Sequence, residues 1–353
     1  MENLPREIEH FLNEVMEIKS SGMEHFRLSW TGEFKVDKRK AITFIKKRAA
    51  SLDLLPVFTA KGKEVIIAFV PEIEVGKSKN WINILLLIIT FFTTLAAGAM
   101  QKGINPLSPI SNLLKGMPFS IAIMLILGGH ELGHYFAARK NNVAATFPYF
   151  IPAPHLIGTF GAVIMMKSPI KDRDSLIEIG AAGPIVGFVL STIALFIGLS
   201  LSTIVSVQNG GILHILLGES ILTKSLTKLY FPSLPRGNEV LLHPVAFAGW
   251  IGYFITAINL LPIGQLDGGH IAYALFEKKH RFIGYLTFIA LLEISLIWFG
   301  WIFWGLLILI VVRFRHPPPL DNISELTLRN RIIGYISFII FTITFIPNPF
   351  QMV

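Results

Sequence analysis

The sequence has no cysteine and little charge. Without thiols the chain can form no disulfide and offers no thiolate to a metal, and its redox compartment is left open. Only 15% of the 353 residues are charged, whereas about a quarter is usual in soluble domains. Internal repeats and low-complexity segments are also missing, apart from the short HPPP at 316–319. The low share of charged residues argues against an ordinary soluble protein.

The amino-terminal residues lack the features of a cleaved signal peptide, because MENLPREIEHFLNEVMEIK is mixed in charge and amphipathic. Residues 1–80 instead predict a small soluble α+β domain. We expect a helix over Leu4–Ile18, a strand in HFRLSWTGEFKV, a second helix capped by Asp37, and a hairpin that turns at Lys61-Gly62-Lys63.

The remainder of the chain is rich in apolar residues. Overall, 52% of residues are hydrophobic, with 28 Phe and a mean hydropathy of +0.60. We predict a polytopic α-helical membrane domain over residues 81–353, with about seven transmembrane helices and a re-entrant or extended hairpin. The expected spans are 82–100, 118–139, 175–200, 241–263, 282–298, 299–313 and 331–347.

Two of these spans come from one apolar run, 282–313, which is too long for a single straight span. Gly300 and its tryptophan neighbours indicate a tight turn between two short helices, and one long tilted helix is the alternative. We interpret Trp298, Trp301 and Trp304 as an aromatic belt at the membrane interface.

Basic residues outnumber acidic ones and the net charge is +8, but they cluster beside the apolar runs. This placement is typical of membrane topology signals and not of a nucleic-acid surface, so no nucleic-acid partner is expected. With seven spans, the clusters fall on one side and predict a multi-pass protein with a cytosolic N-terminus. These clusters are Lys61, Lys63, Lys77 and Lys79, and those at 138–140, 167–173, 277–281, 313–316 and 328–331.

The most informative motif is His-Glu-x-x-His inside the second span, in LILGGHELGHYFAARK. His130 and His134 are four residues apart, so they project from one helix face and can share a metal ion. Zinc suits two imidazoles, and a catalytic zinc site adds a third protein ligand and leaves one position for water. Glu131 is placed to take a proton from a zinc-bound water nucleophile and to pass it to a leaving amine.

The third ligand must lie at the same membrane depth as the two histidines. The fourth span ends in NLLPIGQLDGGH, so Asp267 and His270 both arrive near that depth and remain alternatives. His155 is a weaker competitor. His243 begins the span roughly 30 Å away at 1.5 Å per residue, which excludes it.

Together, GGHELGH on one span and NLLPIGQLDGGH on a later one resemble the site-2 protease family of intramembrane zinc metalloproteases. The segments GTFGAVIMMKSP and HPPPLDNIS are also similar to its prokaryotic and plastid members, and the resemblance covers about residues 118–350, with its core at about 118–275. It implies one zinc ion held by His130, His134 and Asp267, with Glu131 as the catalytic base. Asn259 matches an asparagine that would polarise the scissile carbonyl or hold the substrate backbone.

The resemblance also implies a substrate and a setting. Members of the family cleave single membrane-spanning segments of other proteins in regulated intramembrane proteolysis, and a plastid member would have its N-terminus in the stroma. A helix hides its peptide bonds, so the substrate must unwind first. We expect Gly158–Met165 to offer a strand edge to the unwound substrate. In the alternative interpretation this hairpin only packs at the interface.

Two other classes of protein would bury similar groups. A metal- or proton-coupled membrane transporter also places His and Asp within spans, but it predicts inverted repeats and several unwound helices. The sequence has no repeat and one broken span, at Pro262 and Gly264. A catalytically inactive scaffold would have no need of Glu131.

Overall fold

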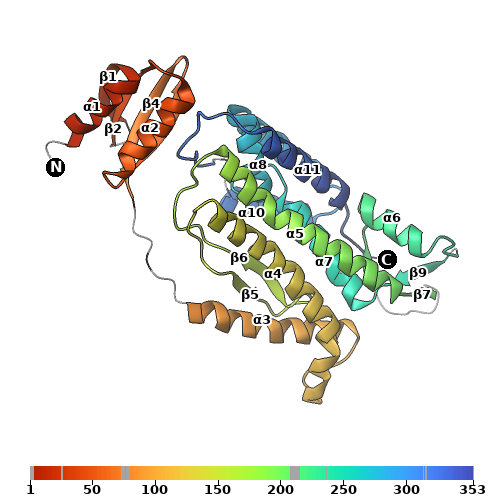
Figure 1. Ribbon diagram of the computed structural model, residues 1–353. Coiled ribbons are helices and arrows are strands. Elements are labelled where there is room, and N and C mark those ends of the chain that lie inside the picture. Colours follow the sequence, from red (N-terminus) through yellow and green to blue (C-terminus); the bar gives the residue numbers. More distant parts are fainter. Residues whose placement is uncertain are drawn as a thin grey trace.

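Two parts of different architecture make up the chain in the computed structural model (Figure 1). The structure describes residues 4–24, 27–72, 76, 80–206, 215–235, 237–312, 314 and 316–352. Some basic residues used above to predict orientation lie outside the described residues, namely Lys77, Lys79, Arg313 and Arg315.

The first part, residues 4–72, is called the N-terminal unit. Its elements are α1 (Leu4–Val15), β1 (Met16–Glu24), β2 (Arg27–Phe34), α2 (Lys38–Ala50), β3 (Leu54–Lys61) and β4 (Glu64–Pro71). The strands form an antiparallel sheet in the order β1-β2-β4-β3. Phe11, Leu12, Trp30, Ile45 and Ile67 belong to the hydrophobic core between this sheet and its helices.

Two local predictions are confirmed in the N-terminal unit, and one is wrong. The Asp37 carboxylate accepts from the backbone N–H groups of Arg39 and Lys40, which starts α2. Gly62 takes a positive φ of 66° between β3 and β4, as a tight hairpin requires. The helix predicted through Ile18 ends at Val15, because residues 16–24 pair with β2 as an additional strand.

The second part is mainly helical. It contains α3 (Asn80–Gln101), η1 (Ile110–Gly116), α4 (Met117–Lys140), β5 (Tyr149–Pro152), β6 (Thr159–Val163), α5 (Arg173–Ser200), β7 (Thr203–Ser206), β8 (Ile215–Leu217), α6 (Ile221–Tyr230), β9 (Asn238–Leu241), α7 (Pro244–Asn259), α8 (Asp267–Phe276), η3 (Glu277–Lys279), α9 (His280–Ile294), α10 (Gly300–Leu307), η4 (Ile308–Val312), α11 (Leu328–Thr344) and β10 (Phe350–Met352). Helix α5 is central, with α4, α7, α8 and α11 packed against it (Figure 1).

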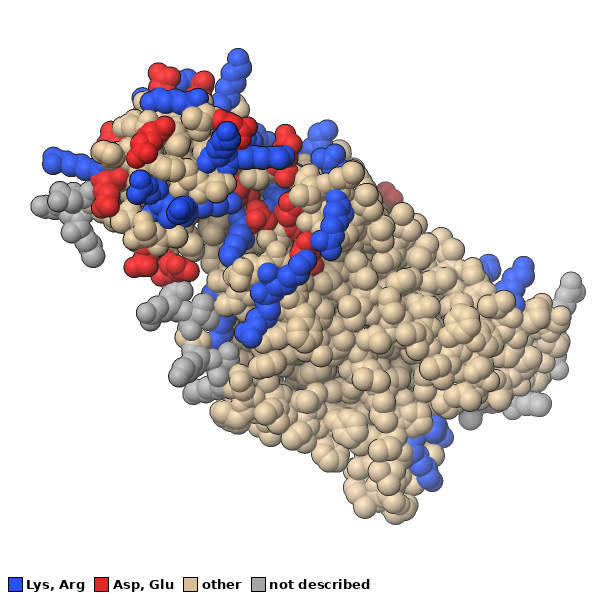
Figure 2. Space-filling model, in the orientation of Figure 1, with Lys and Arg blue, Asp and Glu red and all other residues tan. Residues whose placement is uncertain are grey.

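Three helical segments of the described chain are long and apolar enough to cross a membrane. They are Asn80–Gln101, Ile110–Lys140 and Arg173–Ser200. Pro244–Asn259 and Gly300–Ile310 are shorter apolar helices. On the face drawn in Figure 2, charged side chains gather over the N-terminal unit and the adjoining end of the helices, and a broad uncharged surface covers the middle. This pattern fits a membrane-embedded protein, and the count of seven spans stays a prediction.

The apolar run 282–313 forms two helices, not one. Helix α9 ends at Ile294, a turn follows, and α10 begins at Gly300. The aromatic belt predicted here is wrong for Trp301, which is fully buried, and it stays a prediction for Trp298 and Trp304. The rings of all three tryptophans lie 6.1–6.4 Å from that of Phe254 on α7. These side chains pack α9 and α10 onto the centre of the molecule.

The N-terminal unit contacts the helical part through residues 320–324, which lie between η4 and α11. Phe58 of the edge strand β3 donates its N–H to the Leu320 carbonyl at 2.7 Å and accepts from the Asn322 N–H at 3.3 Å. Lys46 of α2 reaches the Asp321 carboxylate at 2.7 Å. On its other side the segment bonds residues 170 and 171, which precede α5. Residues 320–324 therefore join the sheet of the N-terminal unit to the base of the central helix.

Candidate metal centre

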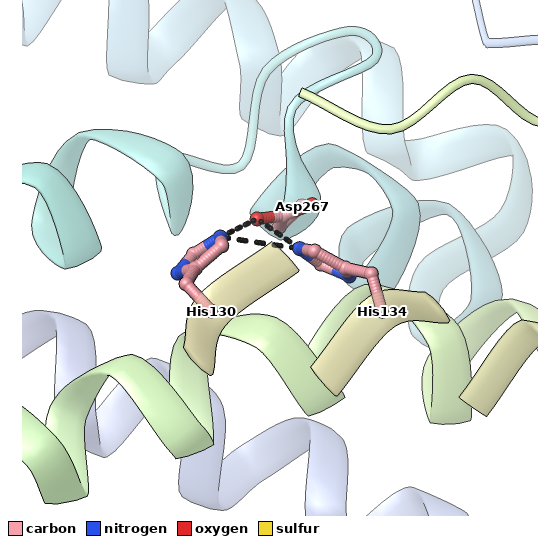
Figure 3. Close-up of side chains that lie close together, drawn as sticks. All are labelled: His130, His134 and Asp267. Atoms are coloured by element: carbon pink, nitrogen blue, oxygen red, sulfur yellow. Dashed lines mark hydrogen bonds and ion pairs between the residues drawn. The ribbon is translucent and has the colours of Figure 1, made fainter. Parts of the chain in front are cut away.

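Helix α4 carries the two histidines of the His-Glu-x-x-His motif on one face (Figure 3). Both side chains are buried, and their Nε2 atoms lie 3.1 Å apart. The spacing of four residues produces this convergence, because it advances the helix by little more than one turn. His130 and His134 thus present two imidazole nitrogens to one point.

Asp267, the first residue of α8, meets these nitrogens from the opposite side. Its Oδ2 lies 3.3 Å from Nε2 of His130 and 3.2 Å from Nε2 of His134 (Figure 3). An irregular stretch, 260–266, separates α7 from α8, and Gly264 within it has a φ of +53°. This break turns the chain so that the start of α8 faces α4.

The three donor groups have the chemistry and spacing of a zinc site. Ligands about 2.0–2.1 Å from a tetrahedral zinc ion are about 3.3 Å from one another, and the three distances in this cluster are 3.1, 3.2 and 3.3 Å. Among the described residues, this is the one group of at least three His, Cys, Asp or Glu side chains with ligand atoms close enough to hold an ion. No Lys or Arg of the described chain forms an ion pair with Asp267, so a bound cation would balance its charge.

Helix α5 supports both histidines. The Nδ1 of His134 lies 2.7 Å from the Ile179 carbonyl, which can only accept, so Nδ1 carries the proton and Nε2 keeps its lone pair for a ligand. Gly183 and Gly187, one turn apart, leave room for the two rings. A Cβ at Gly183 would overlap the His134 ring, and one at Gly187 would lie 3.0 Å from Nδ1 of His130.

Glu131 and Asn259 adjoin the cluster. Glu131 is buried on α4 and accepts a hydrogen bond from the backbone N–H of Ile164, just after β6. Asn259, the last residue of α7, has its side-chain amide nitrogen 3.3 Å from Nε2 of His130. A proton acceptor and a polar amide therefore lie next to the three ligand-type side chains.

The other histidines weighed as ligands lie elsewhere. His270 points its Nδ1 to Nε2 of His316 and takes no part in the cluster. His155 lies beyond β5 with its ring 4.9 Å from that of Phe160. His243 caps α7 by accepting from the Val245 N–H.

Reasoning from the sequence missed the groups that support the cluster. The glycines at 183 and 187 do occur in GAAGPIVG, with helical spacing on the span that follows the motif. That signal was available, but it needs the register of α5 against α4. The carbonyl of Ile179 and the N–H of Ile164 are backbone groups, so no side-chain pattern could indicate them.

Comparison with known proteins identifies a family. The model of the family described as "Peptidase family M50" matches residues 118–297, which include both helices of the cluster. No solved structure matches the chain.

Several plant proteins are similar over most of the chain. "Probable zinc metalloprotease EGY2, chloroplastic" of Oryza sativa subsp. indica is 32% identical over 271 residues, which is 74% of this chain and 49% of the relative. The protein of the same name in Arabidopsis thaliana is 31% identical over 273 residues, 74% of this chain and 48% of the relative. "Probable zinc metalloprotease EGY1, chloroplastic" of Arabidopsis thaliana is 34% identical over 237 residues, 65% of this chain and 43% of the relative. The chain spans about half the length of these relatives.

Proposed function

Because this chain belongs to peptidase family M50, we propose that it is an intramembrane zinc metalloendopeptidase acting on membrane-spanning segments of other proteins. The observation that carries the proposal is the convergence of His130, His134 and Asp267, with ligand atoms 3.1–3.3 Å apart, between two apolar helices. Regulated intramembrane proteolysis is the process that such an enzyme would serve.

In this proposal the three residues hold one zinc ion. The ion, when bound, supplies Lewis-acid activation of water and of the scissile carbonyl. His134 is fixed in the required tautomer by the Ile179 carbonyl. The close fit of the rings against Gly183 and Gly187 limits how far either can turn.

Glu131 is the proposed general base. Its carboxylate is next to the cluster in sequence and in space, and the N–H of Ile164 orients it. It would take the proton of the attacking water and deliver it to the leaving amine. Asn259 would donate from its amide to the scissile carbonyl or to the substrate backbone. A metal- or proton-coupled transporter, the alternative, has no use for this base beside the ligands.

The proposed substrate site is the edge of β6. Among the described strands β6 pairs only with β5, and its Phe160 side chain is 71% exposed. The strand leads directly into Ile164, the residue bonded to Glu131. A substrate segment added along β6 would acquire the backbone partners that it loses on unwinding and would run towards the base.

Variants at Ala162, in the middle of β6, test strand addition. Ala162→Pro removes a backbone N–H, and Ala162→Val retains it while favouring the strand. We expect the proline variant to cleave a model transmembrane substrate at least roughly 10-fold more slowly than the valine variant, with equal zinc content in both. Equal cleavage rates would eliminate the capture role and leave a hairpin that only packs.

We further propose a multi-pass arrangement of about seven transmembrane helices, with residues 1–80 as a cytosolic domain, or a stromal one in a plastid. The gathering of charged side chains over the N-terminal unit supports a position of this unit outside the membrane (Figure 2). Because the chain has no cysteine, single cysteines are unambiguous labels. A membrane-impermeant thiol reagent should label Ser51→Cys only from the cytosolic side and Lys115→Cys only from the opposite side. Labelling of both cysteines from one side would contradict the proposed orientation.

The decisive experiment measures zinc and cleavage together. The purified wild-type chain should contain one zinc ion and cleave model transmembrane substrates. Glu131→Gln should retain the zinc and lose activity by roughly 10³-fold or more. A wild-type protein without zinc affinity, or a fully active Glu131→Gln variant, would falsify the protease proposal.

A further inference from the structure

The first turn of α8 contains Asp267, and its two glycines, Gly268 and Gly269, pack closely on the backbone of residues 260–264. Leu266 precedes it without a side-chain capping bond, and the stretch before that is irregular. The helix is only 10 residues long. A small rotation of this turn about its axis would carry the Asp267 carboxylate away from the two imidazoles, so contacts from outside α8 must set its orientation.

One such contact comes from α5. A Cβ at Gly180 would lie 3.1 Å from Cβ of His270 and 3.3 Å from the Asp267 carbonyl oxygen. The two helices therefore approach closely at this glycine, which sets their separation. A close approach at one point does not by itself prevent α8 from turning about its axis.

A second contact comes from His316, 46 residues further along the chain. Its Nε2 is hydrogen bonded to Nδ1 of His270, one turn after Asp267. Its ring also stacks on that of Tyr273, with centroids 4.6 Å apart and an interplanar angle of 24°. His270 and Tyr273 are three residues apart and share a face of α8, so His316 holds two successive points on that face.

His316 is itself held in place. It is buried, with 6% of its surface exposed, and three prolines that limit backbone freedom follow it. Beyond them, Leu320 and Asp321 donate their N–H groups to the carbonyls of Ile170 and Lys171, at 3.0 and 2.8 Å. The residues before α5 thus anchor the segment that carries His316.

From these contacts we propose that His316 is a positioning residue for the metal centre. Through its hydrogen bond to His270, it fixes the rotation of the first α8 turn and so the direction of the Asp267 carboxylate. This inference rests on the proposed zinc site. It assigns a role to the HPPP segment, which forms no hydrogen bond or ion pair with the three ligands.

Zinc affinity, measured by chelator competition on the full-length protein in detergent, tests the inference independently of cleavage. His316→Phe keeps a ring against Tyr273 and removes the hydrogen bond, whereas His316→Gln retains a side chain able to bond His270. We expect His316→Phe to weaken zinc binding roughly 10-fold, the lower end of the roughly 10–100-fold range for groups bonded directly to a ligand, because His316 acts through His270. We expect His316→Gln to weaken it by no more than roughly 3-fold.

His280→Phe is the matched control. His280 is also a buried histidine, and its ring lies 4.8 Å from that of Tyr273, but its Nδ1 bonds the Glu277 carbonyl instead of His270. Its replacement should leave the zinc affinity unchanged. An equal loss of affinity in His316→Phe, His316→Gln and His280→Phe would overturn the inference, because packing alone would then explain it.

A double-mutant cycle with His270→Leu tests the route of the effect. If His316 acts through His270, the variant with both changes should bind zinc no more weakly than His270→Leu alone. Additive losses would contradict that route. Failure of wild-type protein to bind zinc would instead refute the proposed function, so the two failures are distinguishable.

Discussion

Asp321, in the segment that joins the N-terminal unit to the helices, and Asp267, in the metal centre, have opposite surroundings. The side chain of Asp321 is 1% exposed and meets Lys46 at 2.7 Å, with further hydrogen bonds from Ser324. The side chain of Asp267 is 17% exposed and faces only His130 and His134 among the ionisable groups that pair with it.

The difference shows how charge balance separates a structural carboxylate from a functional one. Burial of an ionised carboxylate is costly unless a cation or several hydrogen bonds compensate it. The chain itself supplies that compensation at Asp321. At Asp267 it supplies two imidazoles, which suit a shared metal ion better than they neutralise a carboxylate. Asp321 thus joins two parts of the protein, whereas Asp267 would acquire its balancing cation from the solvent.

The largest expected effect is that of the metal and of Asp267. Saturating zinc, at 1,000 times its dissociation constant, should stabilise the wild type by about 4 kcal/mol, and Asp267→Asn should lose that stabilisation and all measurable cleavage. Without zinc, the same variant should be close to the wild type in stability, because the two imidazoles only partly balance the carboxylate of Asp267 and can hydrogen bond an asparagine in its place. Thermal unfolding in detergent, with zinc and with chelator, measures both differences. A metal-free variant clearly less stable than the metal-free wild type would contradict this account of Asp267.

A smaller effect is expected from Gly183→Ala. The added methyl group would overlap the His134 ring and displace it from Asp267, so we expect zinc affinity to fall by about 100-fold, the upper end of the range for groups that position ligands. Gly305→Ala in α10 is the control, because its Cβ would meet no atom closer than 3.6 Å. Isothermal titration with zinc measures the affinity of both variants. Equal affinities would show that the close fit between Gly183 and the His134 ring does not position the ligand.

The contact at Asp321 should respond asymmetrically to the loss of either partner. Lys46→Met leaves a buried carboxylate without its cation and should weaken the contact by about 2–3 kcal/mol. Asp321→Asn leaves a lysine side chain that is 40% exposed and can reach water, so we expect a loss of only about 1 kcal/mol. Hydrogen exchange of the Phe58 amide, which bonds Leu320, reports the opening directly. If Asp321→Asn destabilised the contact more than Lys46→Met, the unpaired buried carboxylate would not be the main cost of breaking this ion pair.

The smallest expected effect is a pH dependence of the same contact. Burial opposes ionisation of Asp321, but the hydrogen bond and charge of Lys46 and the bonds from Ser324 outweigh it and hold the pKa of this carboxyl below its ordinary value. The contribution of the Asp321 carboxylate to the stability of the contact is therefore complete above the unfolded pKa of about 3.9. This contribution is lost as pH falls through the lowered folded pKa. Protection of the Phe58 amide, corrected for intrinsic exchange, should be constant from about pH 5 to 8 and decrease below about pH 4. Asp321→Asn should abolish that decrease.

Sequence reasoning was most successful where local spacing determines geometry. The separation of His130 and His134 predicts a shared helix face in any α-helix, and the structure has that arrangement. The choice between Asp267 and His270 was open because both lie within one turn at the same depth. Only the rotation of α8, which depends on contacts distant in sequence, brings Asp267 rather than His270 to the cluster.

Interactions between distant segments were the least predictable. Lys46 and Asp321 are 275 positions apart, and neither belongs to a pattern that indicates the other. The tryptophans of the 282–313 run were assigned to the membrane interface by composition, whereas packing around Phe254 buries Trp301. Hydrophobic periodicity identifies elements, but it does not say which neighbour covers which face.

The covering of strand β3 has a consequence for biosynthesis. β3 is an edge strand of the N-terminal unit, and its partner at Phe58 is the segment around Asp321. The ribosome makes that segment only after about 250 further residues, at a rate of roughly 5–20 residues per second. During this interval the edge has no partner from its own chain, and an open edge readily pairs with other chains. The nascent protein is therefore most prone to association before residues 320–324 are made.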